Sequence, residues 1–121
     1  DPRPVETIIE RISISNEETF PRDIAEPALL HAELRRMAER LAEHLRREGQ
    51  AARTVTTKLR YPDFAIRTRS LTLDVAVDDA ETIGDVACRL LDRALAERPG
   101  ALRLVGVGLK GFESHTQLAL S

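Results

Sequence analysis

Positive charge gathers in one stretch of this chain, and closely spaced cations are the chemistry that binds phosphate. Between positions 53 and 69 the sequence carries five basic side chains and one acid, Asp63. The five are Arg53, Lys58, Arg60, Arg67 and Arg69. The whole chain has 18 Lys and Arg against 20 Asp and Glu, a formal net charge of −2, so the excess is local. This pattern indicates a surface for a polyanion such as a nucleic-acid backbone.

The acidic residues offer no matching site for metal-dependent catalysis. Two-metal nucleotidyl transfer needs carboxylates that converge on ions about 4 Å apart. Asp78 and Asp79 fall between an expected strand and an expected helix, where capping of the helix is the expected role. Glu17 and Glu18 are neighbours on an expected strand, so their side chains face opposite ways.

Histidine, cysteine and glycine give no catalytic pattern either. His31 and His44 would point to nearly opposite sides of one helix, and His115 stands far away along the chain. Cys88 is the single cysteine and lies among apolar residues, so we expect a small buried filler. No Ser or Cys has a nearby base, and the glycines at 106 and 108 lack the following helix of a phosphate loop. We therefore expect no catalytic residue and no metal site in this chain.

Length and composition predict one domain with an aliphatic core. The chain has 121 residues, 42% of them hydrophobic, with three Phe, one Tyr and no Trp. It contains no apolar run of membrane-spanning length and no signal-peptide pattern, so we expect a cytoplasmic protein. It begins at Asp1 with a Pro-Arg-Pro stretch, which suggests a piece of a longer protein with residues 1–10 as a linker.

Two periodicities alternate along the sequence. Period-two alternation predicts strands over about 11–20, 54–61, 66–77 and 102–112, with a tight connection at 62–64. Apolar residues at spacings of three and four predict helices over about 24–48 and 81–97. Asp23 and Glu26 resemble a capping box for the first helix, and Gly49 is expected to end it in the left-handed conformation.

This order, strand, helix, strand, strand, helix, strand, predicts an α+β fold. Each helix has one apolar stripe and the strands alternate, so both helices should pack on one face of a four-stranded sheet and leave the other open. The open face is expected to carry Ser13, Ser15, Thr56, Lys58, Arg60, Gly106, Gly108 and Lys110. Hydroxyls, glycines and cations without aromatics suit phosphate contacts better than base stacking.

The third strand leaves one ambiguity. Leu71 and Leu73 should face the core, yet Arg67 and Arg69 share their parity. Either a bulge near Ser70 switches the faces, or the two arginines lie beyond the helix cover. Both arginines are expected at or near the open face.

Three stretches give the chain a family resemblance. Residues 13–20, SISNEETF, resemble an S-I-G-x-E-x-T-F strand, although Ser15 replaces its Gly and Ile12 its preceding Lys. Residues 59–73 resemble a hairpin with the pattern L-R-x-x-D-F and T-R-S-x-T-L, and residues 103–107 an R-x-[IL]-G-V strand. Together they resemble the little finger, or polymerase-associated, domain of Y-family translesion DNA polymerases of the DNA polymerase IV type. Leu104 and Gly108 stand where some relatives carry Arg.

The resemblance implies a DNA-gripping module over residues 11–112, whose open sheet lies across the major groove of the template–primer duplex. Catalysis and Mg²⁺ would belong to the absent palm, fingers and thumb. The phosphate contacts it implies are Lys58, Arg60, Arg67 and Arg69, with Ser13, Ser15, Arg103 and Lys110 behind them. We expect a monomer.

The tail at 113–121 contains a partial sliding-clamp motif. Gln117, Leu118 and Leu120 resemble a Q-L-x-L-F motif without its final aromatic residue, and the alternative is a plain tail. Two other functions stay open. The domain could serve a catalytically inactive polymerase-like scaffold that acts through partners such as the clamp. It could also be a dimerisation or ligand-binding domain, which would favour an apolar open face.

Overall fold

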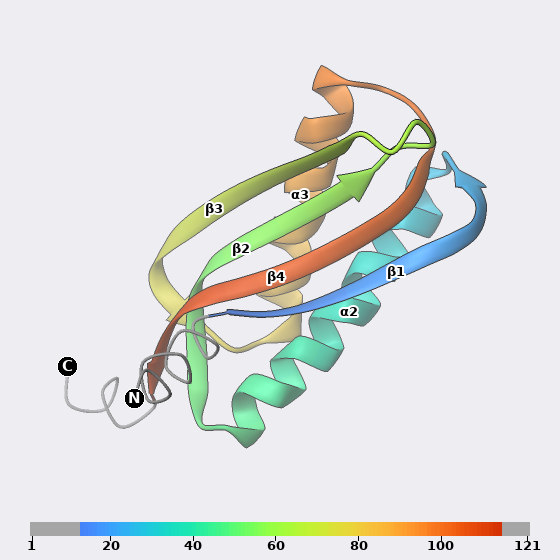
Figure 1. Ribbon diagram of the computed structural model, residues 1–121. Helices are drawn as coiled ribbons and strands as arrows, with labels where there is room; N and C mark the ends of the chain where they lie inside the picture. Colours follow the sequence, from blue (N-terminus) through green and yellow to red (C-terminus); the bar gives the residue numbers. More distant parts are fainter. Residues whose placement is uncertain (1–12, 115–121) are drawn as a thin grey trace, which may run out of the picture.

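The fold consists of four strands and two helices in the predicted order. The computed structural model describes residues 13–114, and the statements below concern that part of the chain. Its elements are β1 (Ser13–Ile24), α2 (Pro27–Arg47), β2 (Gln50–Arg60), β3 (Ile66–Val77), α3 (Ala80–Glu97) and β4 (Leu102–Ser114) (Figure 1). The prediction of an α+β fold in this order is confirmed.

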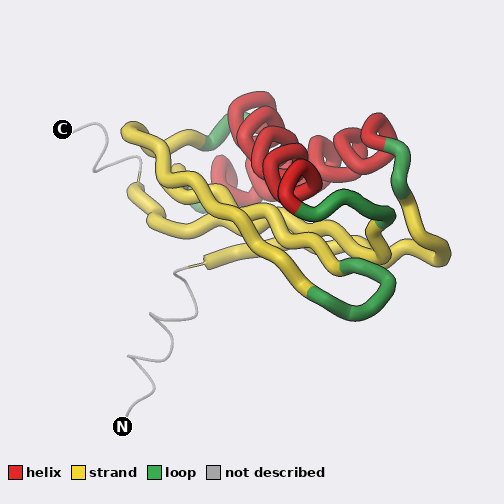
Figure 2. The backbone as a smooth tube through the Cα atoms, turned by 90° about the horizontal axis from the view of Figure 1, so that it is seen from above, coloured by secondary structure: helices red, strands yellow, loops and turns green. Residues whose placement is uncertain are grey.

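The strands form one antiparallel sheet in the order β1-β4-β2-β3, so the last strand of the sequence is inserted between the first and the second. Figure 2 shows both helices on one side of this sheet. Among residues 13–114, no helix covers the other side. This is the split βαβ arrangement with an open face that the sequence predicts.

The core fills the space between the helices and the sheet. It contains Leu30, Leu34, Met37, Leu41, Leu45, Val55, Leu59, Ile83, Leu91, Val105 and Leu109, all 5% exposed or less. Each fully buried aliphatic side chain contributes about 1.5–3 kcal/mol. Thr57 is also fully buried, and its hydroxyl donates to the Ala87 carbonyl at 2.9 Å. Cys88 is a buried filler, as predicted. Neither α2 nor α3 has the length and apolarity needed to cross a membrane.

The junction between β1 and α2 differs from the prediction in two ways. The strand does not stop at Phe20-Pro21 but continues to Ile24, with a shift of register between Thr19 and Ile24. A proline is tolerated there because β1 is an edge strand and the register is irregular. The predicted capping box is also wrong: the N-cap is Glu26, without a side-chain cap bond, and Pro27 opens the helix at a position that suits its fixed φ.

Two tight connections hold β2 in place. Gly49 ends α2 with φ +65° and donates its N–H to the Arg46 carbonyl at 3.2 Å, which confirms the predicted left-handed cap. The β2–β3 turn is closed by Tyr61, whose N–H donates to the Ala65 carbonyl at 2.9 Å. Arg98 lies 4.0 Å from the centroid of the Tyr61 ring and bonds Asp63 at 2.8 Å, so the end of α3 anchors this turn.

Asp79 is the N-cap of α3, the role that the sequence predicts for it. Its carboxylate accepts a hydrogen bond from the Thr82 N–H at 2.8 Å. The pKa of Asp79 is held below its ordinary value mainly by hydrogen bonding to the Thr82 side chain, and the bond from the Thr82 N–H adds to this. A carboxyl with a lowered folded-state pKa stabilises the fold above its unfolded pKa of about 3.9, and this contribution is lost as the pH falls through the folded-state value.

We predict that Asp79→Ala lowers the free energy of unfolding by about 1 kcal/mol at pH 7, because a helix N–H loses its acceptor. Asp79→Asn should retain most of the stability, since Asn caps about as well as Asp. Urea unfolding at pH 7 and at pH 3 measures both effects, and the difference between wild type and Asp79→Ala should shrink at pH 3. Asp74→Ala, which removes an exposed carboxylate on β3, is the control. An equal loss in that variant would assign the effect to net charge.

Candidate nucleic-acid interface

The register of the strands fixes which residues share the open face. Residues directly opposite one another in an antiparallel pair point to the same side. Across the sheet, Gly108 of β4 lies opposite Ser15 and Thr56, and Gly106 lies opposite Glu17 and Lys58. The open face therefore carries Ser13, Ser15, Glu17, Thr19, Thr54, Thr56, Lys58, Arg60, Ile66, Thr68, Ser70, Thr72, Leu104, Gly106, Gly108 and Lys110. The eight residues predicted for it are all there.

Hydroxyl groups occupy much of this surface. The Thr54 and Thr72 hydroxyls are 3.0 Å apart, and those of Thr56 and Ser70 are 2.6 Å apart. Sequence reasoning did not place Thr54, Thr68, Ser70 or Thr72 there. A signal was present for the three β3 residues, since they alternate with Arg67 and Arg69.

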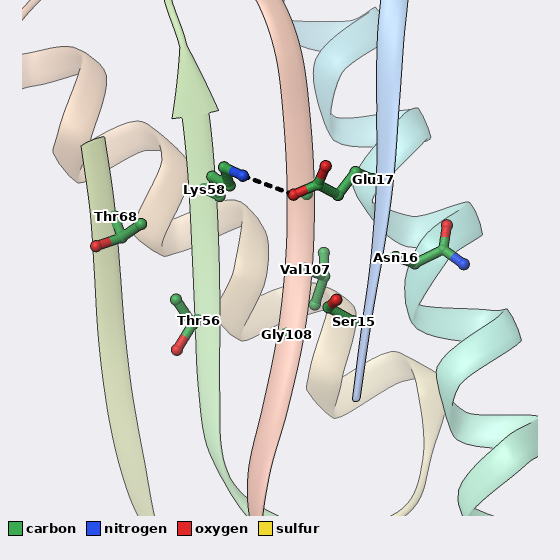
Figure 3. Close-up of a pocket in the computed structure, with 9 residues that line it drawn as sticks. Ser15, Asn16, Glu17, Thr56, Lys58, Thr68, Val107 and Gly108 are labelled. Carbon is green, nitrogen blue, oxygen red and sulfur yellow. Dashed lines mark hydrogen bonds and ion pairs between the residues drawn. The ribbon is translucent and has the colours of Figure 1, made fainter. Parts of the chain in front are cut away.

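A shallow hollow of about 210 Å³ lies in the middle of the face. Its floor is β4 at Gly106 and Gly108, and its walls include Ser15 on β1 and Thr56 and Lys58 on β2 (Figure 3). The two glycines leave β4 without side chains on the open face between Leu104 and Lys110, so a ligand can approach its backbone closely there.

An ion pair crosses the hollow. The Lys58 Nζ lies 2.7 Å from the Glu17 Oε2, and Figure 3 shows the two side chains reaching toward each other over β4. Gly106 makes this contact possible, because a Cβ at that position would lie 3.2 Å from the Glu17 Cγ. Glu17 is the one acid among the open-face residues, and sequence reasoning did not identify it as part of the site.

The other two cations of the open face are unpaired within residues 13–114. Arg60 is half-buried and Lys110 is exposed, and neither has an ion-pair partner in that range. Three cations against one acid give the face a net charge of +2. It is therefore positive although the whole chain is slightly acidic.

Arg67 and Arg69 do not lie on the open face, so the expectation of a place on that face is wrong; they flank Thr68, which lines the hollow, but point to the helix side of β3. They are opposite Leu59 and Thr57, which face the helices, and the pairing is regular near Ser70, so no bulge switches the faces there. The second alternative holds: the two arginines lie on the helix side of the sheet, beyond the area that the helices cover. Both contact the carboxylate of Glu97 at the end of α3, Arg67 at 3.0 Å. The hydrogen bond from Arg69 is the main cause that holds the pKa of Glu97 below its ordinary value. The register of β3 is irregular further along, between Thr72 and Val77.

The remaining predicted residues divide between the end of the sheet and the tail beyond residue 114. Arg103 has the parity of Val105 rather than that of the open face, and its Nε donates to Asp23 at 2.9 Å. Gln117, Leu118 and Leu120, and likewise His115, lie outside the described residues. Within 13–114, no three His, Cys, Asp or Glu side chains gather as a metal site would require.

Fold and face together define a class: a split βαβ domain whose uncovered sheet presents cations, hydroxyls and glycines. The profile of the impB/mucB/samB family C-terminal domain matches residues 11–121. The chain belongs to this family. This family agrees with the predicted resemblance to the little finger domain of Y-family polymerases of the DNA polymerase IV type.

The curated relatives are named DNA polymerase IV, and each is longer than this chain. The chain is 38% identical to a DNA polymerase IV of Streptomyces coelicolor over 97% of its own length and 24% of that protein. It is 43% identical to one from Caulobacter vibrioides and 44% to one from Methanoculleus marisnigri, covering 93% and 84% of this chain and 27% and 28% of those proteins. The chain thus spans about a quarter of the curated relatives it matches.

Solved structures share the fold. One, an insertion ternary complex of Dbh DNA polymerase, matches with a TM-score of 0.74 at 16% identity, over 84% of this chain and 28% of that one. Another, a complex of the beta-clamp processivity factor and the little finger domain of PolIV, matches with a TM-score of 0.65 at 19% identity, over 81% of this chain and 86% of that one.

We predict that alanine has opposite effects at the two glycines of the hollow. A Cβ at Gly108 would meet Ser15 and Thr56 at ordinary distances of 3.8 and 3.9 Å, so Gly108→Ala should keep or raise the free energy of unfolding, by up to about 1 kcal/mol. A Cβ at Gly106 would lie 3.1 Å from the Asn16 carbonyl oxygen, so Gly106→Ala should lower it by about 1–2 kcal/mol. Chemical denaturation of both variants measures the difference, and equal stabilities would contradict this geometry.

Proposed function

We propose that this domain binds the phosphate backbone of duplex DNA through its open face, as the DNA-gripping part of a translesion polymerase. The observation that supports this most is the set of cations at 58, 60 and 110 on an uncovered sheet, among hydroxyls and glycines. These groups bond phosphate oxygens and read no base sequence, so binding should be independent of sequence.

The unpaired cations are the first candidates for phosphate contacts. Within the described chain, Arg60 and Lys110 can bind phosphate without breaking an ion pair, whereas Lys58 must first release Glu17. Ser13 and Ser15 line the same face on β1 and can donate hydroxyl hydrogens to phosphate oxygens. Each contact releases condensed counterions, so it contributes about −0.9 to the slope of log affinity against log salt on B-DNA.

Arg67, Arg69 and Arg103 are secondary candidates. Two arginines share the single carboxylate of Glu97, which leaves one net positive charge at the β3 edge. A DNA backbone that curves around this edge would meet that charge. Arg103 is neutralised by Asp23, so its contribution requires that pair to open.

The wider role concerns a protein longer than this chain. We propose that the parent is a cytoplasmic DNA-directed DNA polymerase, that its catalytic carboxylates and Mg²⁺ lie in other domains, and that this domain, as a monomer, steadies the template–primer for lesion bypass. The DNA polymerase IV relatives support the proposal. The scaffold alternative differs in one respect: its parent would lack those carboxylates.

We predict that Lys58→Glu/Arg60→Glu weakens binding to a short primer–template duplex at least tenfold at low salt and makes the salt slope shallower by about 0.9 to 1.8, because the contact of Arg60 is lost in full and that of Lys58, which Glu17 opposes, is lost in part. Fluorescence anisotropy at several salt concentrations measures both quantities. Arg89→Glu/Arg93→Glu is the control, since it changes the net charge equally on the exposed side of α3. Equal losses in the two double variants, or no binding by the wild type at low salt, would refute a phosphate-binding sheet and favour the scaffold function.

A second proposed contact is the sliding clamp, through Gln117, Leu118 and Leu120. The little finger domain that shares this fold forms a complex with a beta clamp, which supports the proposal. We predict that Leu118→Ala/Leu120→Ala abolishes clamp binding in isothermal titration calorimetry while DNA binding stays unchanged. Restoring an aromatic residue with Ser121→Phe should strengthen clamp binding. If the Leu118→Ala/Leu120→Ala variant binds the clamp as the wild type does, the tail is not the contact.

A further inference from the structure

We propose that Glu17 sets the DNA affinity of the open face by competing with phosphate for Lys58. The inference rests on the proposed DNA-binding function and assigns a role to a residue that opposes it. Glu17 is the one carboxylate among the open-face residues. It lies on the edge strand β1 and reaches over β4 to Lys58 of β2.

The geometry makes this contact specific. Glu17 and Lys58 are both opposite Gly106 in the register, on the two strands that flank β4. They meet 2.7 Å apart because the position between them has no side chain. Any side chain at position 106 would stand between the two charges. The pair therefore depends on the same glycine that opens the hollow to a ligand.

The two charges are exposed enough for phosphate to replace the carboxylate. The side chains of Lys58 and Glu17 keep 32% and 43% of their accessible surface, and ion pairs this exposed are weak. A phosphate at the hollow can take over the ammonium group. The displaced carboxylate stays on the same face and repels the phosphate, because β1 holds its backbone in place. DNA binding thus incurs a constant electrostatic cost at this position.

Glu18 provides a matched control, because it is the adjacent residue with the same charge. It is opposite Val105, a buried residue on the helix side, and so points away from the open face. On the helix side, the pKa of Arg36 on α2 is raised mainly by Glu33, and the charge of Glu18 adds to this. Glu17 and Glu18 are both exposed, so replacing either with Gln removes one negative charge from the surface of β1. Only Glu17→Gln removes it from the hollow.

The test compares the wild type with Glu17→Gln and Glu18→Gln by fluorescence anisotropy on one primer–template duplex over a range of salt. A unit repulsion at about 4 Å in water is worth about 1 kcal/mol, so Glu17→Gln should bind about fivefold more tightly at low salt. Its salt slope should be steeper by up to about 0.9, because Lys58 changes from a partial to a full phosphate contact. Glu18→Gln should stay within twofold of the wild type.

A double-mutant cycle with Lys58→Gln tests the mechanism. If Glu17 acts through Lys58, then Glu17→Gln should raise affinity less in the Lys58→Gln background than in the wild type. Thermal unfolding of each variant checks that the fold is intact. Unchanged or weaker binding by Glu17→Gln, or an equal gain in Glu18→Gln, would overturn the inference while DNA binding by the wild type stands. Absence of DNA binding in every variant at low salt would overturn this inference together with the proposed function.

Discussion

The two-residue alternation of β2 and β4 couples the core of this domain to its open face. Every residue between two buried side chains of these central strands must point away from the helices. The burial of Val55, Thr57 and Leu59 therefore fixes Thr56, Lys58 and Arg60 on the uncovered side. A slip of one residue would expose the core and bury the cations, so the aliphatic packing that holds the fold together also holds the candidate interface.

Most cations that attract attention in the sequence form ion pairs with acids from distant parts of the chain. Lys58 pairs with Glu17, Arg67 and Arg69 with Glu97, and Arg103 with Asp23. The basic stretch between positions 53 and 69 is thus partly balanced by acids elsewhere in a chain that is slightly acidic overall. The ion pairs also mean that a polyanion meets two kinds of cation, those that are available at once and those that must exchange a carboxylate for a phosphate. Exposed pairs of this kind are weak enough for such an exchange.

The β2–β3 turn shows how the helix layer supports the sheet at its far end. The Tyr61 ring is buried beneath the Arg98 guanidinium, and its hydroxyl donates to the Arg98 carbonyl at 2.7 Å. The same arginine bonds Asp63, whose pKa is held below its ordinary value mainly by that bond. Phe64 is left at the tip with φ +71° and 79% of its surface exposed, a conformation that is unfavourable for a bulky residue. The turn is therefore fixed by its flanking residues.

The sequence by itself determined the order of the elements, the single face covered by helices and the eight residues predicted for the open face. These follow from local periodicity, which each segment carries regardless of its neighbours. Tertiary structure alone decided which charges meet. Glu17 and Lys58 are brought together because β4 inserts between β1 and β2, and Arg67 and Arg69 reach Glu97 because α3 ends beside the β3 edge. Asp23 was misjudged as a helix cap because an edge strand can continue past Pro21. Periodicity tells which way a side chain points, whereas its electrostatic partner depends on distances between segments that are remote in sequence.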